Sequence, residues 1–327
     1  MPANLTPEYF KAEKWFRSAT SNDEKIMALE QMLRVMPKHK GTDHMRADLR
    51  KKLSRLKEGG GQKKSGKHVD IFHVPRSGAG QIVLIGTPNC GKSSIVAGLT
   101  NAKVNVADFP FATNVPAPGM VKFEDIKIEL VDMPPITADY SAPGQVGTYR
   151  NCDLIAVVID LSGDVEEQIL ICLDFLESRS LLADNETPAH DSQGNVLGKK
   201  AFCICTKCDI AKSGALENLK KLCKYPFEFV EVSAMTDDGL EGLAEKLFKL
   251  LGIIRIYSKP PGKPADMTDP FTLPVGSTVM DLASTVHRQL AEKLKFARIW
   301  GTGVYDGQNT QRNHVLNDKD VIELHFS

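Results

Sequence analysis

The sequence predicts an α/β fold, built on a mostly parallel, doubly wound sheet with a helical region before it. Three observations support this prediction. The apolar run 81–85 is typical of a buried strand, and it leads into a glycine-rich loop and a helix. Three later apolar segments, 128–132, 201–205 and 227–232, are also typical of strands. Before residue 68, apolar residues instead recur at helical spacing.

These early apolar stripes predict an N-terminal helical hairpin arm. Pro37 and Gly41 separate the last two stripes. Ser21, followed three residues later by Glu24, forms a capping box at the start of the second helix. The stripes comprise Leu5, Tyr9, Ala12 and Phe16, then Ile26, Leu29, Leu33 and Met36, then Met45, Leu49, Leu53 and Leu56.

The charge of the chain is unevenly distributed, although 41 basic and 41 acidic residues give no net charge. Residues 38–67 hold eleven Lys or Arg and three acidic residues, a balance of +8, so the remainder carries −8. A basic arm on an acidic body is typical of proteins that contact RNA, and a solvated helix face is the alternative. The third helix is expected to bury its leucines while its cations stay in water; these are Arg46, Arg50, Lys51, Arg55 and Lys57.

Residues 86–93 fit the phosphate-loop pattern G-x-x-x-x-G-K-[ST], and a helix is expected after them, from Ser94 to Leu99. In such a loop, backbone N–H groups point at phosphate, Lys92 reaches the β- and γ-phosphates, and the Ser93 hydroxyl coordinates magnesium. The two glycines are expected because a Cβ would crowd the phosphates. The residues predicted here to bind nucleotide are Gly86, Asn89, Cys90, Gly91, Lys92, Ser93 and Ser94.

Three further segments follow in the order of a guanine-nucleotide site. The strand 128–132 ends in an acid whose carboxylate is expected to orient magnesium through water. Residues 206–209 fit the pattern [NT]-K-x-D, in which a buried Asp209 would accept hydrogen bonds from guanine and be left unpaired by adenine. Lys207 would lie along the base. The pair Ser233-Ala234, which follows the strand 227–232, would present its backbone to the guanine carbonyl. The residues predicted here are Asp132, Thr206, Lys207, Asp209, Ser233 and Ala234.

Together these motifs resemble the Obg-like branch of translation-factor GTPases, most closely the developmentally regulated GTP-binding proteins. The loop start 86–89 resembles the G-x-P-N of that branch, and 109–113 resembles its Y-P-F-T-T switch segment. The segment from 253 to 326 resembles a TGS domain, a small ubiquitin-like β-grasp sheet, on residues 264–269 and 297–301. There the stripe Val279, Leu282, Val286 and Leu290 would pack on strands near 271–273, 297–300 and 321–326.

The resemblance covers nearly the whole chain. It implies a basic helical region at 1–68, a P-loop GTPase domain at 79–252 and a TGS domain at 253–327. It also implies GTP or GDP with magnesium as ligands, and a ribosome, structured RNA or protein partner in translation. A slow GTPase acting as a molecular switch is the function expected. A guanine-nucleotide-binding scaffold or sensor without useful hydrolysis is the alternative.

The chain departs from the family at both switches. The family has D-x-P-G where this chain has Pro135, which has no N–H to offer the γ-phosphate. No catalytic glutamine follows the second switch motif, and Ile136 occupies its position. Ala112 replaces the first switch threonine, so Thr113 becomes the candidate for magnesium and γ-phosphate, beside Lys92 as the catalytic pair. The family also implies a potassium ion that Asn89 helps to hold, although Asn89 could equally support the turn.

The long insertion of the nearest relatives is absent. Between Asp160 and Lys200 there is room only for one helix, at about 165–182, and a polar loop. The sequence has no run of 18 apolar residues and its start has no signal-peptide pattern, so a cytoplasmic protein without a membrane partner is expected. The seven cysteines suit a reducing compartment. Cys203, Cys205 and Cys208 are expected to be structural rather than metal ligands.

Overall fold

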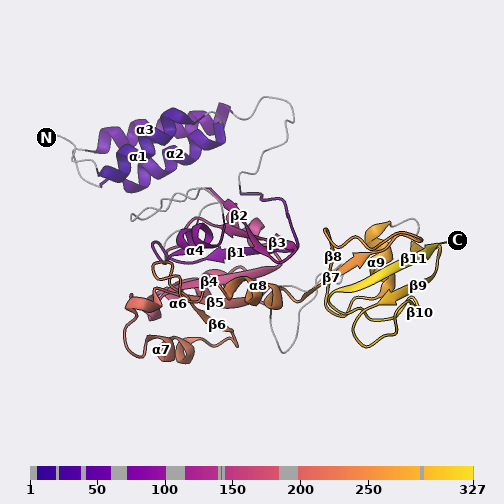
Figure 1. Cartoon of the computed structure of the whole chain (residues 1–327). Coiled ribbons are helices and arrows are strands. Elements are labelled where there is room, and N and C mark those ends of the chain that lie inside the picture. The colour runs from indigo at the N-terminus through magenta and orange to yellow at the C-terminus, as the bar shows by residue number, and fades with distance from the viewer. Residues whose placement is uncertain are drawn as a thin grey trace. The chain divides into compact units, whose positions relative to one another are not determined.

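The computed structural model describes residues 6–19, 22–37, 42–59, 72–100, 115–138, 141, 144–183, 198–287 and 291–326. The chain divides into two compact units, Met1–Val69 and Asp70–Ser327. The first holds three helices, and the second holds two sheets, each with its own hydrophobic core (Figure 1).

The first unit consists of α1 (Pro7–Ser18), α2 (Asn22–Val35) and α3 (Asp43–Gly59). Each of the three predicted stripes forms one helix. Thr6 caps α1 by accepting a hydrogen bond from the backbone N–H of Tyr9 at 3.3 Å. Leu5 and the Ser21 of the predicted capping box lie outside the described residues. The three helices share one apolar core, made of Tyr9, Ala12, Leu29, Met32, Met36 and Leu49.

The exposed face of α3 is basic. Arg50, Lys51 and Lys52 are exposed, and Leu49 is buried in the core of the unit. The prediction for Arg46 was wrong, because its guanidinium donates a 2.9 Å hydrogen bond to the Met36 carbonyl and the residue is half-buried. A carbonyl beyond the end of a helix needs such a donor. The side chains of Arg55 and Lys57 fall outside what the structure describes.

The second unit begins with a six-stranded sheet, which confirms the predicted mostly parallel architecture. Its strands lie in the order β2-β3-β1-β4-β5-β6, and β2 is antiparallel to β3 while the other pairs are parallel. We call this part the six-stranded domain. Its strands are β1 (Gln81–Ile85), β2 (Ala117–Phe123), β3 (Ile126–Asp132), β4 (Leu154–Asp160), β5 (Lys200–Thr206) and β6 (Phe229–Glu231). Its helices are α4 (Lys92–Leu99), α5 (Gln145–Asn151), α6 (Val165–Glu177), the 3-10 helix η1 (Cys208–Ile210), α7 (Ala215–Leu222) and α8 (Leu243–Leu251).

Every residue of β1 is buried, so this strand is the centre of the domain. Ile82 and Leu84 share one apolar cluster with Ile95 of α4 and Leu243 of α8. The alternate residues of β1 point to the opposite face of the sheet, because side chains alternate along a strand. This double-sided burial explains why the run contains hardly any polar residue.

Several elements of this domain were not predicted or differ from the predictions, and α6 and β2 have clear physical reasons. The helix expected to reach residue 182 ends at Glu177, and Ser180 then takes a left-handed φ of 51° that no helix continues. The edge strand β2 was not predicted, because it contains Pro118 and Gly119, which are rare in strands. At the sheet edge they are tolerated, and a Cβ on Gly119 would come within 2.8 Å of Val96 and Thr100.

The second sheet has the strand order β10-β9-β11-β7-β8, with β11 parallel to β7 and the other pairs antiparallel. We call this part the five-stranded domain. Its helix buries Val279, Leu282 and Ala283 on one face of the sheet. The prediction that Val286 is buried was wrong: it is 38% exposed at the last position of the helix, and Leu290 lies outside the described residues. The elements are β7 (Ile253–Ser258), β8 (Phe271–Pro274), α9 (Val279–Val286), β9 (Leu294–Trp300), β10 (Gln308–Thr310) and β11 (Asp320–Phe326).

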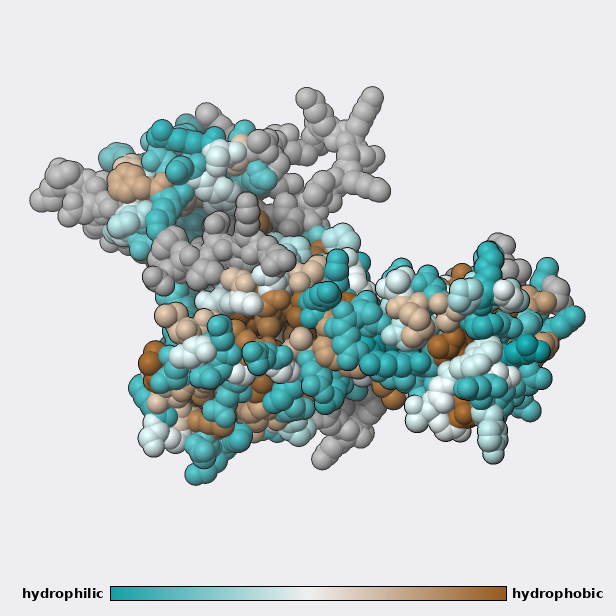
Figure 2. All heavy atoms as spheres, in the orientation of Figure 1, coloured by the Kyte–Doolittle hydropathy of each residue, from teal (hydrophilic) through white to brown (hydrophobic). Residues whose placement is uncertain are grey.

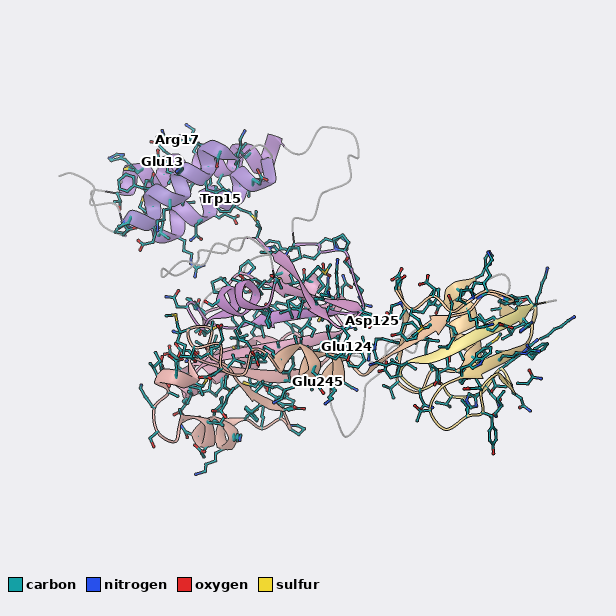
Figure 3. The ribbon with its side chains drawn as sticks, viewed as in Figure 1. Glu13, Trp15, Arg17, Glu124, Asp125 and Glu245 are labelled. Atoms are coloured by element: carbon teal, nitrogen blue, oxygen red, sulfur yellow. The ribbon has the colours of Figure 1, made fainter. Side chains whose placement is uncertain are left out.

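Arg255 of β7 joins the two sheets. Its side chain is only 3% exposed and donates to Glu124 and Asp125 at the turn between β2 and β3, at 2.5 and 2.9 Å. It also holds Asp318 of its own domain at 2.7 Å, and its guanidinium lies 4.8 Å from the ring centre of Phe248. Figure 3 labels Glu124 and Asp125 at this turn. A planar fork with several carboxylate partners is the arrangement that arginine suits best.

Hydrophilic residues cover most of the visible face of the helical unit, whereas apolar residues gather on part of the six-stranded domain (Figure 2). None of the helices that the structure describes has the length and apolar character that crossing a membrane requires.

Candidate functional site

The loop between β1 and α4 wraps around the ammonium group of Lys92. This side chain is 5% exposed, and its Nζ donates to the carbonyls of Gly86 at 3.0 Å and Thr87 at 2.9 Å. Nζ also lies 3.5 Å from Sγ of Cys90. Burial raises the pKa of the Cys90 thiol despite the nearby lysine charge, so the thiol stays neutral. The loop therefore keeps one fixed positive charge beside backbone that leads into a helix N-terminus.

Two glycines shape this loop, and the structure gives a reason for each in addition to the predicted crowding of phosphates, which stays a prediction. A Cβ on Gly86 would lie 2.5 Å from Sγ of Cys90 and 2.7 Å from the carbonyl of Val158. Gly91 has a φ of 96°, in the left-handed region that glycine adopts without strain. Close contacts within the protein thus require Gly86, and the backbone conformation requires Gly91, before any phosphate is considered.

The predicted metal ligands meet at the end of β3. Oγ of Ser93, in the first turn of α4, donates a 2.5 Å hydrogen bond to Oδ2 of Asp132, which is fully buried. A hydroxyl and a carboxylate are the oxygen donors that magnesium prefers, so this pair fits the predicted cation. Ser94 is half-buried on the next position of the helix. Thr113 and the rest of the predicted first switch lie outside the described residues.

Asn89 is exposed and has a φ of 60°. Asn is one of the few side chains that adopt this left-handed conformation readily, which accounts for its presence in the loop. Its side chain makes no hydrogen bond to any residue that the structure describes. The turn-supporting bond considered from the sequence is therefore not formed, and the role in holding a cation stays a prediction.

The segment 206–209 lies against the phosphate loop. Oγ1 of Thr206 donates to the carbonyl of Cys90 at 2.7 Å, which ties the end of β5 to the loop. Lys207 has a strained φ of 56°, and its Nζ forms a 2.6 Å ion pair with Asp160. Asp209 follows in η1 and is exposed rather than buried as predicted. Its carboxylate is therefore in contact with water in this structure.

The last predicted segment lies beside the third one. The backbone N–H of Cys208 donates to the carbonyl of Val232, immediately before Ser233. Ser233 is fully buried, and its Oγ accepts hydrogen bonds from the N–H groups of Met235 and Thr236 at 3.2 and 3.3 Å. These bonds fix the turn that leaves Ala234 exposed. The sequence therefore brings two distant short motifs to one edge of the sheet.

Two functional neighbours were missed from the sequence, Asp160 and Gln168. Burial disfavours ionised Asp160, but hydrogen bonds from Lys207 and Ser162 outweigh burial and lower its pKa. Gln168 of α6 accepts from the Asp160 N–H at 2.9 Å and lies 3.5 Å from the hydroxyl of Thr87. The sequence signal for Asp160 was its position as a polar residue at the carboxyl end of a parallel strand, because ligands bind at that edge of such sheets.

The segment after Asp132 is held against the loop. Pro134 and Pro135 are buried and have no N–H, and the N–H of Ile136 donates to the Gly86 carbonyl at 3.2 Å. The Ile136 side chain is fully buried and apolar, so it offers nothing to orient a water. Pro135 and Ile136, the two departures from the family motif in this segment, are thus both buried and offer no free donor.

The cysteines agree with the structural interpretation. Cys203 and Cys205 are fully buried, with sulfurs 3.9 Å apart on β5. Burial raises the pKa of Cys203 well above its usual value, and of Cys208 more modestly. No group of three or more His, Cys, Asp or Glu side chains suited to a metal ion occurs in the described part of the chain.

Comparison with known proteins finds two family models that match parts of the chain. Residues 81–186 match the model of the 50S ribosome-binding GTPase family, and residues 254–325 match the TGS domain. The developmentally-regulated GTP-binding protein 1 of Xenopus laevis is 28% identical over 85% of this chain and 90% of its own length. GTP-binding protein 1 of Schizosaccharomyces pombe is 26% identical over 92% of this chain and 98% of its own.

A solved structure, the FeoB G-domain from Methanococcus jannaschii, covers 53% of this chain and 97% of its own, at 22% identity and a TM-score of 0.38. The match to the 50S ribosome-binding GTPase family lies within the six-stranded domain, and the match to the TGS domain spans most of the five-stranded domain. Over most of its length the chain is a homologue of the developmentally regulated GTP-binding proteins.

Proposed function

We propose that this chain binds GTP and GDP with magnesium and hydrolyses GTP slowly, as a cytoplasmic switch that associates with ribosomes or structured RNA. The observation that carries the proposal is the convergence of three motifs at one sheet edge: Lys92 in its loop, the Ser93–Asp132 pair and the Lys207–Asp160 pair. The proposed parts are a basic helical region at 1–68, a GTP-binding domain at 79–252 and a TGS domain at 253–327.

In this proposal the residues of the chain have separate roles. Lys92 and the backbone of the loop neutralise the phosphates, and Ser93, Thr113 and Asp132 are the residues that would hold magnesium. Bound magnesium would supply charge neutralisation on the transferring phosphoryl group. Asp209 would select guanine, because its carboxylate accepts from two donors that adenine lacks. Lys207 would position the base while Asp160 fixes the lysine.

The partner proposal depends on charge. Arg50, Lys51 and Lys52 leave a basic face on α3, opposite the leucines that pack in the core. Such a face attracts the phosphates of RNA, and this attraction weakens as salt is added. The name of the matching family, a 50S ribosome-binding GTPase, favours the ribosome as the RNA partner.

A second candidate function is a guanine-nucleotide scaffold or sensor with little hydrolysis. It is favoured by the buried Pro135, which has no N–H for the γ-phosphate, and by the buried Ile136 in place of a water-orienting residue. Hydrolysis would then depend on a cation at Asn89 or on the partner.

Single-turnover GTP hydrolysis tests the two candidates. It is measured in potassium and in sodium buffer, with and without ribosomes, beside Lys92→Ala, which should abolish nucleotide binding. Phosphate release that potassium or ribosomes stimulate supports the slow GTPase. Tight GTP binding without release under any of these conditions supports the scaffold, and no binding at all refutes both. In the scaffold case, release by Pro135→Gly would show that the missing N–H is the cause.

A further inference from the structure

The five-stranded sheet has one covered face and one face that carries rings and cations. α9 covers the face that contains Ile299 and Ile322. The register places Phe296 opposite His325, Arg298 opposite Glu323 and Trp300 opposite Val321 on the other face. Because side chains alternate along a strand, these three positions of β9 point away from the helix. Neither Phe296 nor Trp300 belongs to the apolar core of the domain.

This outer face, which we call the ring face, is already organised. The rings of Phe296 and His325 are stacked, with centres 4.4 Å apart and planes 13° apart. The ammonium of Lys259 lies 4.8 Å from the ring centre of Trp300 and pairs with Glu323. His325 pairs with the same carboxylate at 2.7 Å. Phe296, Trp300 and His325 are all half-exposed, so each ring keeps surface for a ligand.

The β7 end of the same face is occupied. Arg255 and Tyr257 point outward there and bind Asp125 of the six-stranded domain. The part that stays accessible is therefore β11, β9 and β10. Arg298 lies opposite Glu323, Lys259 pairs with Glu323, and Lys295 of β9 is exposed, so these cations outnumber this one carboxylate.

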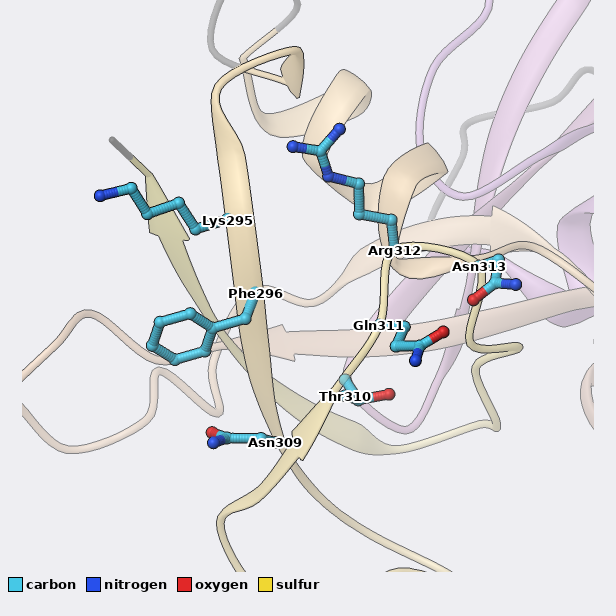
Figure 4. A pocket seen from close by; sticks show the side chains of 7 residues that line it. All are labelled: Lys295, Phe296, Asn309, Thr310, Gln311, Arg312 and Asn313. Carbon is cyan, nitrogen blue, oxygen red and sulfur yellow. The ribbon is translucent and has the colours of Figure 1, made fainter.

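A hollow of about 510 Å³ adjoins the ring face at the edge of β9 and β10. Lys295, Phe296 and Asn309 project to the same side of these strands, and Arg312 projects to the other side, where its guanidinium donates to the carbonyl of Leu294 (Figure 4). The hollow is open to solvent, so a ligand can reach it from the ring face. Amide and ammonium groups beside a flat ring are what an unpaired base and its phosphate can use together.

We propose that the ring face binds an unpaired RNA strand, with bases stacked on Phe296 and Trp300 and phosphates held by Lys295 and Arg298. The inference deepens the proposed RNA partner and rests on it. Every base has a flat face that stacks on an aromatic ring, so binding should tolerate different sequences. In duplex RNA the bases are already stacked and paired, so a duplex should bind weakly here. An acidic peptide could use the cations but would gain little from the exposed flat rings.

The test uses the full-length chain and a labelled uridine 12-mer, with fluorescence anisotropy as the readout. Phe296→Ala and Arg298→Glu should each weaken binding about tenfold or more, as expected for losing one stacked base or reversing one phosphate contact. Tyr305→Ala and Lys263→Glu are the matched controls, because both residues are exposed in the same domain and neither lies on β9 or β11. Thermal melting of each variant separates lost binding from lost folding.

A second readout is specific to the ring face. The chain has two tryptophans, so Trp15→Phe leaves Trp300 as the only one. Stacking of a base should quench its fluorescence during the uridine titration, and a duplex of equal length should not. Equal affinities of the Phe296 variant and the controls, or no quenching at saturation, would overturn the proposal. Binding of a glutamate-rich peptide that Phe296→Ala abolishes, with no RNA binding, would assign the face to a protein partner instead.

Ribosome sedimentation separates this inference from the proposed function. Ribosome binding by the wild type without any uridine 12-mer binding refutes the ring face alone. Uridine binding that depends on Phe296, without ribosome binding or GTP binding, refutes the proposed function while the ring face stands.

Discussion

Replacing Arg255 by Met should loosen the junction between the two sheets of the second unit. The side chain is 3% exposed and makes four charge-assisted hydrogen bonds, to Glu124, Asp125 and twice to Asp318. Met keeps most of the volume beside Phe248 but donates nothing. Breaking a buried ion pair by removing one partner costs about 3–5 kcal/mol.

The expected cost is smaller here. The carboxylate side chains are 20–48% exposed and can regain water when the arginine is gone. Discounting for this solvent access, we expect the free energy of unfolding to fall by about 2 kcal/mol. For a unit of this size the melting temperature should then drop by about 5 °C.

Lowering the pH should weaken the ion pairs that Arg255 makes with Glu124, Asp125 and Asp318. Hydrogen bonds from Lys319 and Arg255 lower the pKa of Glu124. Burial opposes ionisation of Asp125 and Asp318, but their hydrogen bonds outweigh it and lower both pKa values. Carboxyl groups with lowered pKa values stabilise the fold above their unfolded value of about 4, and this stabilisation is lost as the pH falls through the folded values. The difference in stability between wild type and Arg255→Met should therefore shrink below about pH 4.

Urea unfolding of both proteins from pH 7 to pH 3 measures this difference. Lys249→Met is the matched control, since that lysine is 68% exposed and pairs only with the exposed Glu245 of its own helix; it should cost under about 0.5 kcal/mol. In a double-mutant cycle, Asp125→Asn should cost less when Arg255 is already Met. An Arg255→Met variant as stable as the control at pH 7 would refute the reasoning.

Three further predictions concern the site. Asp209→Asn should remove most of the preference for guanine over adenine nucleotides, by about tenfold or more, measured with fluorescent GTP and ATP; an unchanged ratio would argue against the assigned base site. Gly86→Ala should destabilise the fold by about 2–3 kcal/mol in urea, because its Cβ would clash with Cys90 and Val158, whereas Gly242→Ala, with no neighbour within 4 Å, should cost little. A thiol reagent should modify at most Cys208 and Cys223 in the native protein, since the other five cysteines are buried; release of more thiols before unfolding would contradict the structure.

The sequence was informative wherever local pattern and chemistry agree. β1 is buried at every position, and its apolar run left no alternative to a strand at 81–85. The pairing of Ser93 with Asp132 also follows from motif order, because the carboxyl ends of neighbouring parallel strands meet at one edge. This contact was therefore predictable before any coordinates, and the metal and phosphate roles of these residues stay predictions.

What could not be predicted depends on contacts between distant residues. β2 contains Pro118 and Gly119, and only its position at the sheet edge makes them acceptable. The ion pair of Lys207 with Asp160 spans 47 residues, and no local pattern announces it. The clash that a Cβ on Gly86 would make with Val158 could not be predicted either, because Val158 comes from a strand whose position the loop sequence does not specify.

The hydrogen bonds to the Gly86 carbonyl bear on how this chain could contact a γ-phosphate. Its carbonyl accepts from Lys92 and also from Ile136, so the phosphate loop and the segment after Asp132 share one acceptor. Two successive prolines remove the donors that precede Ile136, and the first N–H after them is used within the protein. A γ-phosphate could gain a contact from this segment only if that hydrogen bond were broken, which has a free-energy cost. On the proposed function, the difference in affinity between GTP and GDP should then come mainly from the first switch and magnesium, and the slow GTPase and the scaffold would share one binding site.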